Sequence, residues 1–557
     1  MNLYDAIFRS DRRDNIAVLG DGLHLTYKDL RDLTADAVNV LKELNLSAGD
    51  RVAILLNDSP EFIVSFISIC SLGAIAVPIN MALRLDAQKQ ILDDCTATAA
   101  IVEADFCSRL LTGEWERLRH LKNVVVVERC QADSDFIENA KENAKTNSSE
   151  TELPIRIHSW TKLTGRGETG DQALAEPNFP ANGEDRPSFI LYTSGSTGEP
   201  KGAVHRTADI FYTNETFCRQ VLRLRDGDRL FSSSRLPFAY GLGNAFTFPL
   251  LNGFTTVLCR AKPTAEVIAG VLRDFNPTIL FGVPVVYTSL LDYHNRVEML
   301  DCSSLRLCIS AGEALPARIG EDWEKTFRVP ILDGIGSTEM LHMWMSNQQG
   351  KVRYGSSGNL LSGYEARLLD PEGNTTAHGQ EGNLWVKGAS AARGYWEQPA
   401  ATARTFVDGW VRTGDLYRVD DDGYWYHMGR SDDCFKSSGQ WVSPIEVENV
   451  LLRNQNVNTA AVVEDFDELG LPCACAFVIK QRLESDVTLI ETELREQCRQ
   501  LLSRHKQPRR YIFVDKLPYT ATGKIQRFKL REALRNLEFR ISSLQDITLC
   551  KAERGER

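Results

Sequence analysis

The sequence predicts an α/β protein with a second, smaller domain at its C-terminal end, and three observations support this fold class. Short β-branched runs alternate with amphipathic segments, the pattern of parallel strands joined by crossover helices. Short segments punctuated by turn signals follow from Glu365 to Tyr426. At 557 residues the chain also exceeds the size at which a single hydrophobic core stops growing. We therefore expect two or more cores.

Eight apolar runs are expected to form the strands of the parallel sheets, because helix-like segments separate them along the chain. They are Arg51 to Leu55, Ala74 to Ile79, Ala99 to Val102, Asn123 to Val127, Phe189 to Tyr192, Thr255 to Cys259, Thr278 to Phe281 and Leu305 to Ser310.

The uncharged stretch from Phe62 to Leu83 is weighed against a membrane span. Ser65, Gly73 and Pro78 interrupt it. A buried helix followed by the buried strand from Ala74 therefore fits better than a span.

Several later segments, the first of which begins at Asp133, differ in composition from the alternating strand and helix pattern. Asp133 to Asn182 is polar, and its first half is interpreted as a surface insertion with a mobile tip. Turn signals such as Asp420-Asp421-Asp422-Gly423 indicate antiparallel strands before Arg430. The block after Arg430 is small enough for one α+β domain, and Ile541 to Arg557 is interpreted as a frayed tail.

Composition excludes several classes of protein. A net charge of −11 and a pI near 5.5 provide no general attraction for nucleic acid. The 13 cysteines, mostly in apolar settings, are typical of buried free thiols in a reducing compartment. No zinc site is expected, since Cys473 and Cys475 lack partners at metal-ligand spacing. The charged N-terminus, with Asp5 and Arg9, does not match a signal peptide, so we expect a cytoplasmic protein.

The segment from Tyr192 to Gly202 carries the strongest chemical signal. It places three glycines, four Ser or Thr hydroxyls and Lys201 behind an apolar run. Glycines let backbone N–H groups approach an anion, hydroxyls donate to its oxygens, and lysine adds positive charge. A Ser/Gly-rich linker is the alternative, but a linker needs no lysine. A P-loop is excluded because Lys201 follows Pro200 and precedes Gly202.

Five further segments follow this loop in order and, with it, resemble the adenylate-forming enzymes, a superfamily of acyl-CoA synthetases, carrier-loading adenylation domains and luciferases. These segments are Ser310-Ala311-Gly312-Glu313, Asp333-Gly334-Ile335-Gly336-Ser337-Thr338-Glu339, Arg412-Thr413-Gly414-Asp415, Gly429-Arg430-Ser431-Asp432-Asp433 and Thr522-Gly523-Lys524-Ile525.

Within that superfamily the chain is most similar to benzoate-CoA ligases and related aryl-CoA ligases. The segments that carry this likeness are Pro237-Phe238-Ala239-Tyr240-Gly241-Leu242-Gly243-Asn244, Gly336-Ser337-Thr338-Glu339-Met340-Leu341-His342 and Trp441-Val442-Ser443-Pro444.

The resemblance implies an N-terminal domain, residues 1–430, with α/β sheets and a small β-barrel-like part. A mobile C-terminal domain, residues 431–557, would carry the catalytic lysine, with the joint at Asp432. ATP, Mg²⁺ and coenzyme A (CoA) are the expected cofactors and co-substrates. The expected nucleotide-binding residues are Thr193, Ser194, Gly195, Ser196, Thr197, Lys201, Gly312, Asp333, Gly334, Asp415 and Arg430.

Forming an acyl adenylate brings two anions together, so cancelling their repulsion is most of the catalytic task. Lys524 follows a Thr-Gly turn, and its flexible stem can deliver charge to both partners. Thr338 is expected near the α-phosphate, and Glu339 is expected to hold Mg²⁺. Plainer alternatives are a solvated surface lysine and a helix N-terminal carboxylate. Likewise, Asp415 is either a ribose ligand or a turn residue, and Arg430 a sugar or phosphate donor or a surface ion-pair partner.

The acyl pocket is expected, from the resemblance, to be lined by Ala239, Tyr240, Ile335, Gly336 and His342. Small apolar walls with an aromatic face suit a flat ring, and no acidic residue is evident to pair with an α-ammonium group. His342 is either a hydrogen-bond partner of the carboxylate or of a ring substituent, or a satisfied core residue.

Thioester formation is expected to use other residues. Gly439 would let the pantetheine arm pass close to the backbone, and Lys436 would face the active site in that conformation. Where aryl-CoA ligases usually have Val and Ile, this chain has Ser437 and Gln440. Since Lys524 and Gly439 would serve different half-reactions, the C-terminal domain must turn about Asp432.

The sequence therefore predicts an ATP-dependent ligase of aromatic acids and CoA. The main alternative is a stand-alone adenylation enzyme that loads a carrier-protein pantetheine. A non-catalytic nucleotide-binding protein and an oxidative luciferase fit less well. No nucleic acid or membrane partner is expected, and a homodimer is compatible with the sequence.

Overall fold

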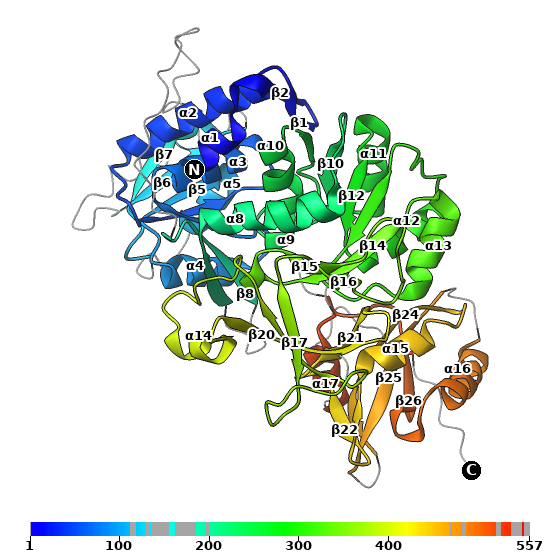
Figure 1. Cartoon of the computed structure of the whole chain (residues 1–557). Coiled ribbons are helices and arrows are strands. Elements are labelled where there is room, and N and C mark those ends of the chain that lie inside the picture. Colours follow the sequence, from blue (N-terminus) through cyan, green and yellow to red (C-terminus); the bar gives the residue numbers. More distant parts are fainter. Residues whose placement is uncertain are drawn as a thin grey trace.

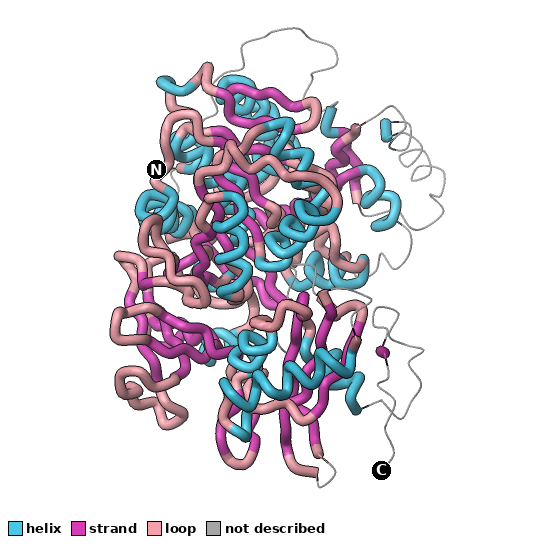
Figure 2. The backbone as a smooth tube through the Cα atoms, turned by 90° about the vertical axis from the view of Figure 1, so that its right-hand side faces the viewer, coloured by secondary structure: helices cyan, strands magenta, loops and turns pink. Residues whose placement is uncertain are grey.

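The computed structural model describes residues 2–111, 118–129, 133–134, 137, 155–161, 185–194, 200–467, 470–481, 486–519, 525–535 and 549–550. Figure 1 shows two helix-covered sheets side by side, a smaller sheet below them, and the C-terminal strands and helices at the opposite end. Figure 2, turned by 90°, shows the same division along the long axis of the molecule.

The first large sheet has seven strands in the order β7-β6-β5-β3-β4-β8-β9, all parallel except the last. Strand β5 is buried along its whole length because layers cover both faces of the sheet. The strands are β3 (Arg51–Leu55), β4 (Ile75–Pro78), β5 (Ala99–Glu103), β6 (Asn123–Val127), β7 (Arg156–Ser159), β8 (Phe189–Ser194) and β9 (Pro200–His205).

Helices pack on both faces of this sheet. On one side lie α1 (Leu3–Ile7), α2 (Tyr27–Glu43) and α3 (Pro60–Ser71), and on the other α4 (Leu85–Asp94) and α5 (Ala104–Leu111). Helix α3 and strand β4 confirm the expected buried helix and strand within the uncharged stretch. Among the described residues, no helix has the length and apolar character that a membrane crossing requires.

The second large sheet has nine strands in the order β16-β15-β14-β13-β12-β10-β11-β1-β2. Its centre is parallel, and β2, β15 and β16 add antiparallel edges. The strands are β1 (Ile16–Gly20), β2 (Leu23–Thr26), β10 (Arg229–Ser232), β11 (Thr255–Leu258), β12 (Ile279–Gly282), β13 (Leu307–Ser310), β14 (Ile331–Gly336), β15 (Met343–Ser346) and β16 (Asn359–Leu360).

Helices cover both faces of this sheet. On one face, α11 (Ala265–Phe275), α12 (Pro284–Arg296) and α13 (Ala317–Phe327) share a hydrophobic core with its strands, and on the other face η3 (Asn214–Leu222) does so. Shorter helical segments lie between the large sheets or at loop turns, and they are η1 (Ser10–Arg12), α8 (Thr207–Thr213), α9 (Ala239–Leu242), η4 (Gly243–Thr247), α10 (Phe248–Asn252) and η5 (Thr338–Met340).

The turn-rich region forms the expected antiparallel strands. They pair in the order β17-β18-β20-β19, and β21 pairs with β20. The elements are β17 (Glu365–Leu369), β18 (Gly382–Lys387), α14 (Pro399–Thr405), β19 (Phe406–Val407), β20 (Trp410–Val419) and β21 (Trp425–Arg430).

The C-terminal part has two hydrophobic cores built only from residues after Arg430. A β22-β23 hairpin and the sheet β24-β25-β26-β27 form its strands. The elements are β22 (Phe435–Ser437), β23 (Gln440–Val442), α15 (Pro444–Leu451), β24 (Val457–Phe466), β25 (Pro472–Lys480), α16 (Val487–Leu501), η6 (Arg504–Lys506), β26 (Arg510–Val514), α17 (Arg527–Arg535) and β27 (Leu549–Cys550).

All eight strands expected from the sequence are present in the large sheets. Part of the expected insertion from Asp133 to Asn182 instead contributes edge strand β7 to the seven-stranded sheet. Most of that insertion, and the expected tail after Ile541 apart from β27, lie outside the described residues.

Candidate active site

The predicted site residues lie near the ends of strands β13 and β14 and on the neighbouring β8-β9 hairpin. Thr338 and Glu339 occupy η5, the short turn between antiparallel strands β14 and β15. His205, at the end of β9, donates from Nε2 to the carbonyl oxygen of Thr338 over 2.8 Å. Its Nδ1 lies 3.0 Å from Asp209 Oδ2, and both side chains are fully buried. The η5 turn is therefore anchored to the strand that carries Lys201.

Tyr395 connects the carboxylate and the lysine predicted for this site. Its hydroxyl donates to Glu339 Oε1 over 2.7 Å. Lys201 Nζ lies 5.6 Å from the centre of the Tyr395 ring, within cation–π range. Burial, and then the Glu339 charge, raise the pKa of Tyr395, so the hydroxyl stays protonated and remains a donor. The oxygen atoms of a carboxylate held in this way are hard ligands of the kind that Mg²⁺ requires.

Asp415 and Arg430 face each other across the paired strands β20 and β21. Arg430 donates to Asp415 Oδ1 over 3.2 Å and to the Thr413 carbonyl over 3.0 Å. Burial lowers the pKa of Arg430, but the negative charges of Asp415, Asp432 and Glu339 outweigh it and raise the pKa overall. The structure therefore brings these four predicted residues into one electrostatic group.

The residues predicted to flank adenine lie just after β13 and within the neighbouring strand β14. Gly312 follows β13 with a φ of +95°, a conformation that a side chain rarely adopts. Asp333 and Gly334 lie in β14, and a Cβ on Gly334 would come within 2.3 Å of the Met345 carbonyl oxygen. Asp333 accepts a hydrogen bond from Leu315 N over 3.3 Å, and burial raises the pKa of its carboxyl to about 8.

The five residues predicted for the acyl pocket come from two elements. Ala239 and Tyr240 begin helix α9, whereas Ile335, Gly336 and His342 flank η5. The rings of Tyr240 and His342 are 5.6 Å apart, and a Cβ on Gly336 would meet the His342 carbonyl oxygen at 2.6 Å. Tyr240 donates to the Ile309 carbonyl over 3.2 Å, which ties this wall to strand β13.

An ion pair between the buried Asp58 and the partly buried Arg235 holds the segment that leads into α9. Asp58 Oδ1 accepts from Leu236 N over 3.0 Å, and its Oδ2 lies 3.3 Å from Arg235 NH1. Arg235 also donates to the carbonyl oxygens of Arg260 and Ala261 after strand β11. The two large sheets thus jointly position the aromatic wall of the acyl pocket.

Several predicted residues lie outside the described residues, namely Gly195, Ser196, Thr197 and Lys524. Of their neighbours, Thr193 and Ser194 pair with Lys201 and Pro200 in the β8-β9 hairpin. Ile525, which follows Lys524, donates its backbone N–H to Glu313 Oε1 over 2.9 Å. The residue directly after Lys524 therefore contacts the Ala-Gly-Glu segment that follows strand β13.

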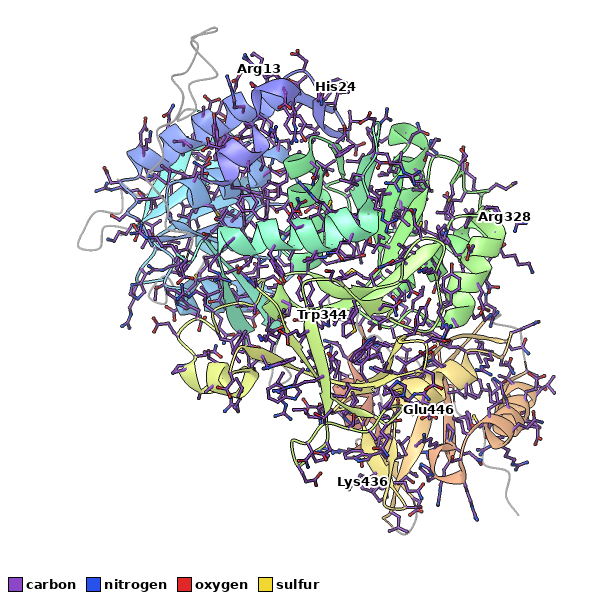
Figure 3. The ribbon with its side chains drawn as sticks, viewed as in Figure 1. Arg13, His24, Arg328, Trp344, Lys436 and Glu446 are labelled. Atoms are coloured by element: carbon purple, nitrogen blue, oxygen red, sulfur yellow. The ribbon has the colours of Figure 1, made fainter. Side chains whose placement is uncertain are left out.

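The structure does not bring Lys436 and Gly439 to this site. They lie on the β22-β23 hairpin, and both are exposed. Nothing lies within 4 Å of a Cβ placed on Gly439, whose φ is +77°. Figure 3 shows Lys436 at the far end of the C-terminal part, well separated from Trp344 in strand β15. Asp432 is exposed in the turn between β21 and β22, the place that a hinge requires.

Four site residues, His205, Asn244, Asp58 and Tyr395, were not among the sequence predictions. His205 and Asp209 have helical i, i+4 spacing, a weak signal in the sequence. Asn244 stands in the segment that carries the resemblance and hydrogen-bonds His342. Nothing in the local sequence singles out Asp58 or Tyr395, because their partners are 178 and 56 positions away.

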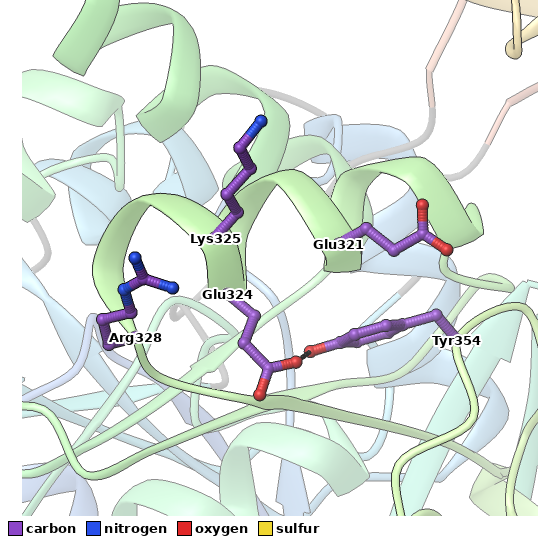
Figure 4. Close-up of a pocket in the computed structure, with 5 residues that line it drawn as sticks. All are labelled: Glu321, Glu324, Lys325, Arg328 and Tyr354. Carbon is purple, nitrogen blue, oxygen red and sulfur yellow. Dashed lines mark hydrogen bonds between the residues drawn. The ribbon is translucent and has the colours of Figure 1, made fainter.

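A pocket lies away from this site, beside helix α13. Figure 4 shows Glu321, Glu324, Lys325 and Arg328 around Tyr354, whose hydroxyl donates to Glu324 over 2.8 Å. Tyr354 also accepts from the backbone of Ile331, at the start of β14, whereas Gly336 and the site lie at its end.

Two family models match the chain. The AMP-binding enzyme family covers residues 8–396, and the AMP-binding enzyme C-terminal domain covers residues 446–524. Together with the strand-end site described above, these matches define the class: the chain belongs to the AMP-binding enzyme family. It is an AMP-forming acid–thiol ligase.

The chain is also similar to individual members of this family. The benzoate–CoA ligase of Thauera aromatica is 40% identical over 498 residues, 88% of this chain and 87% of that protein. The crystal structure of an anthranilate–CoA ligase with anthranoyl-AMP has a TM-score of 0.86 at 34% identity, covering 96% of this chain and 97% of that chain. A benzoate–CoA ligase of Burkholderia xenovorans has a TM-score of 0.80 at 33% identity, covering 95% and 100%.

Proposed function

We propose that this enzyme activates an aromatic, benzoate-like carboxylic acid with ATP and transfers the acyl group to CoA. The observation that carries the proposal is the aromatic wall of Tyr240 and His342 directly beside the turn of Thr338 and Glu339. An aromatic wall beside residues that could bind phosphate groups would suit an aryl acid and ATP. The similarity to benzoate–CoA and anthranilate–CoA ligases supports it.

The first half-reaction joins the acid to AMP. A carboxylate oxygen of the acid attacks the α-phosphorus of ATP, and the bond to pyrophosphate breaks. Lys201, Arg430 and Lys524 offset the repulsion between the two anions, and the backbone around Gly312 and Gly334 receives adenine.

Glu339 would hold Mg²⁺, since its carboxylate is a hard oxygen ligand kept in place by Tyr395. When bound there, the ion would supply positive charge to the phosphate oxygens. Thr338 faces the α-phosphate, with its carbonyl oxygen held by His205. Thr193, Ser194 and Thr197 would surround the leaving pyrophosphate, and Asp415 would accept from the ribose hydroxyls.

The second half-reaction forms the thioester. The CoA sulfur attacks the acyl carbon, the bond to the adenylate oxygen breaks, and AMP leaves. Gly439 would line the path of the pantetheine arm, with Lys436 beside it. Both are remote from the site here, so residues 431–557 would turn relative to residues 1–430 about Asp432. The contacts that such a turn must break include Ile525 with Glu313.

A carrier-protein pantetheine is a second candidate for the acceptor. Two residues on the Gly439 hairpin support this alternative. Ser437 and Gln440 are polar, where aryl-CoA ligases usually have apolar residues. We also propose that the enzyme acts in the cytoplasm, alone or as a homodimer.

The test measures pyrophosphate release and product mass for a panel of benzoates, cinnamates and fatty acids, with and without CoA. We expect release to depend on a benzoate-class acid and the acyl-CoA thioester to appear only with CoA. If decanoate exceeds every benzoate, the aryl assignment is wrong. If acyl adenylate persists in the presence of CoA, the acceptor is a carrier protein.

A further inference from the structure

A buried histidine and aspartate, His205 and Asp209, connect strand β9 of the phosphate loop to the turn η5. Both side chains are fully buried, and neither belongs to the segments that carry the family resemblance. His205 ends β9, and Asp209 lies in helix α8. The imidazole ring stacks on the ring of Phe189 in β8, with centres 5.3 Å apart and an interplanar angle of 17°. This stacking fixes the plane of the imidazole and therefore the directions of its two nitrogens.

Asp209 determines how the two nitrogens of His205 bond. Its Oδ1 accepts from Arg206 Nε over 2.9 Å, and its Oδ2 accepts from the Arg206 backbone N–H over 3.0 Å. The same Oδ2 lies 3.0 Å from His205 Nδ1. A carboxylate paired with arginine offers only lone pairs, so Nδ1 is a donor. The Thr338 carbonyl oxygen also offers only lone pairs, so Nε2 donates to it.

A second segment, between β18 and α14, also holds η5. The backbone N–H of Ala392 donates to the carbonyl oxygen of Glu339 over 2.8 Å. Arg206, which pairs with Asp209, donates from NH2 to the carbonyl oxygen of Ala389 over 2.9 Å. One network therefore joins β9 to this segment and reaches two consecutive carbonyl oxygens of the turn.

We propose that His205, held by Asp209, is a positioning residue for acyl adenylate formation. Its Nε2–H fixes the carbonyl of Thr338, and this sets the direction in which the side chains of Thr338 and Glu339 leave the turn. The inference rests on the proposed adenylation chemistry, in which these two side chains would face the phosphates of ATP. A shift of about 1 Å in a positioned group can lower a rate about hundredfold.

Adenylation should depend on this turn more than thioester formation does. In the first half-reaction two anions approach each other and pyrophosphate leaves, so the phosphate-facing groups must be placed accurately. In the second half-reaction a sulfur attacks an acyl carbon that is already activated. We therefore expect the contribution of His205 in the first half-reaction.

Two variants separate the bond to Thr338 from the bond to Asp209. In His205→Gln the amide nitrogen takes the position of Nε2, so the donor to Thr338 is kept. In His205→Asn the shorter side chain keeps a donor for Asp209 at the position of Nδ1 but does not reach Thr338. Both variants remove the ring and its stacking on Phe189, so a purely structural role predicts equal effects.

The measurement is the single-turnover rate constant of pyrophosphate release, at saturating ATP, with the acid that the parent enzyme uses best. His205→Asn should lower it about ten- to hundredfold and leave the half-saturating acid concentration within about threefold. His205→Gln should stay within about threefold of the parent. Both variants should form thioester from supplied acyl adenylate and CoA at the parent rate.

Two further variants complete the set. Asp209→Asn keeps the shape of the side chain but weakens the anchor of the ring, so it should lower the same rate constant, by less than His205→Asn does. His294→Gln is the control, since that ring accepts a hydrogen bond from the Leu300 backbone over 3.0 Å at the end of helix α12. It should leave both half-reactions unchanged.

The outcomes separate this inference from the proposed function. Equal losses in His205→Gln and His205→Asn, or equal losses in both half-reactions, would assign His205 to packing and overturn the inference. A parent rate in Asp209→Asn would overturn the role of Asp209. A parent enzyme that prefers a fatty acid overturns the aryl assignment, and the comparison of variants with that acid still decides the role of His205.

Discussion

At the scale of single residues, Tyr395 links the metal-binding candidate Glu339 to the phosphate-loop lysine. Its hydroxyl reaches Glu339 Oε1, and its ring faces Lys201 Nζ. Neither contact moves protons or electrons in the reaction. Tyr395 is therefore a positioning residue, and its removal should change how the site uses Mg²⁺ more than how it uses the acid.

Tyr395→Phe tests this role. Losing a hydrogen bond to a carboxylate costs about 1.5–3 kcal/mol, so adenylation at limiting Mg²⁺ should fall about ten- to hundredfold. The measurement is pyrophosphate release as a function of Mg²⁺ concentration. Excess Mg²⁺ should recover much of the rate. Tyr424→Phe is the matched control, since that hydroxyl donates to the exposed Lys351 carbonyl. An unchanged Mg²⁺ requirement would leave Tyr395 a packing residue.

Asp333 yields a prediction about pH. Burial raises the pKa of its carboxyl to about 8, whereas an unfolded aspartate ionises near pH 3.8. Between these values the folded state holds one more proton than the unfolded state. Stability is therefore fully present below pH 3.8 and falls as pH rises toward 8, by up to about 1.4 kcal/mol per pH unit.

Asp333→Asn replaces the protonated acid by a neutral group of the same shape. The fall of the melting temperature between pH 6.5 and 8 should therefore be shallower in the variant than in the parent. Above pH 6.5 the buried His342 does not oppose this trend, because its pKa is lowered and it is neutral in both states. If the melting temperatures of the two proteins change with pH in parallel, Asp333 is ionised in the folded state.

At the scale of elements, an ion pair between the buried Asp58 and the partly buried Arg235 positions helix α9. Ala239 and Tyr240 form the first turn of a helical segment that continues without a break through η4 and α10 to Asn252. Its approach is fixed by Asp58 on Leu236 N and by Arg235 on the carbonyls after β11. A Cβ on Gly241 would lie 2.0 Å from the Arg235 carbonyl oxygen, so this turn tolerates only glycine.

Asp58→Asn keeps an acceptor for Leu236 N but leaves Arg235 without its buried counter-charge. Breaking such a pair costs about 3–5 kcal/mol, so the melting temperature should fall and KM for the aryl acid should rise more than KM for ATP. Glu365→Gln, which breaks an exposed pair with Lys387, is the control and should change neither. Equal increases in both KM values would exclude a specific link between Asp58 and the acyl pocket.

At the scale of the whole molecule, the part of the chain before Arg430 contacts the C-terminal part in one particular arrangement. Ile525 binds Glu313, and Arg318 donates to the carbonyl oxygens of Leu452 and Asn454 over 3.1 and 2.9 Å. In this arrangement Ile525, the residue after Lys524, lies beside Glu313, and the hairpin that carries Lys436 and Gly439 lies far away. The structure thus matches the state proposed for adenylation.

Glu313→Ala should weaken this arrangement without touching the Gly439 hairpin. We expect acid-dependent pyrophosphate release to fall about tenfold, since one charge-assisted hydrogen bond is lost. Thioester formation from supplied acyl adenylate and CoA should keep its rate. Glu321→Ala, on the exposed face of helix α13, is the control.

Gly439→Trp should do the reverse of Glu313→Ala, because it fills the proposed thiol path with a side chain. Acyl adenylate should then accumulate while pyrophosphate release continues. If either variant impaired both half-reactions equally, the two would share one arrangement and no turn about Asp432 would be needed.

The sequence by itself determines the chemistry that depends on neighbours along the chain. The glycines and hydroxyls before Lys201, the β-branched runs of the parallel sheets and the uncharged α3-β4 segment act through local backbone freedom and periodicity. Tertiary structure alone decides which distant groups meet. Tyr395 reaches Glu339 across 56 positions, Asn244 reaches His342 across 98, and His205 reaches Thr338 across 133. Those pairings depend on which strands share a sheet edge and how α9 packs between the sheets, and no local pattern encodes that packing.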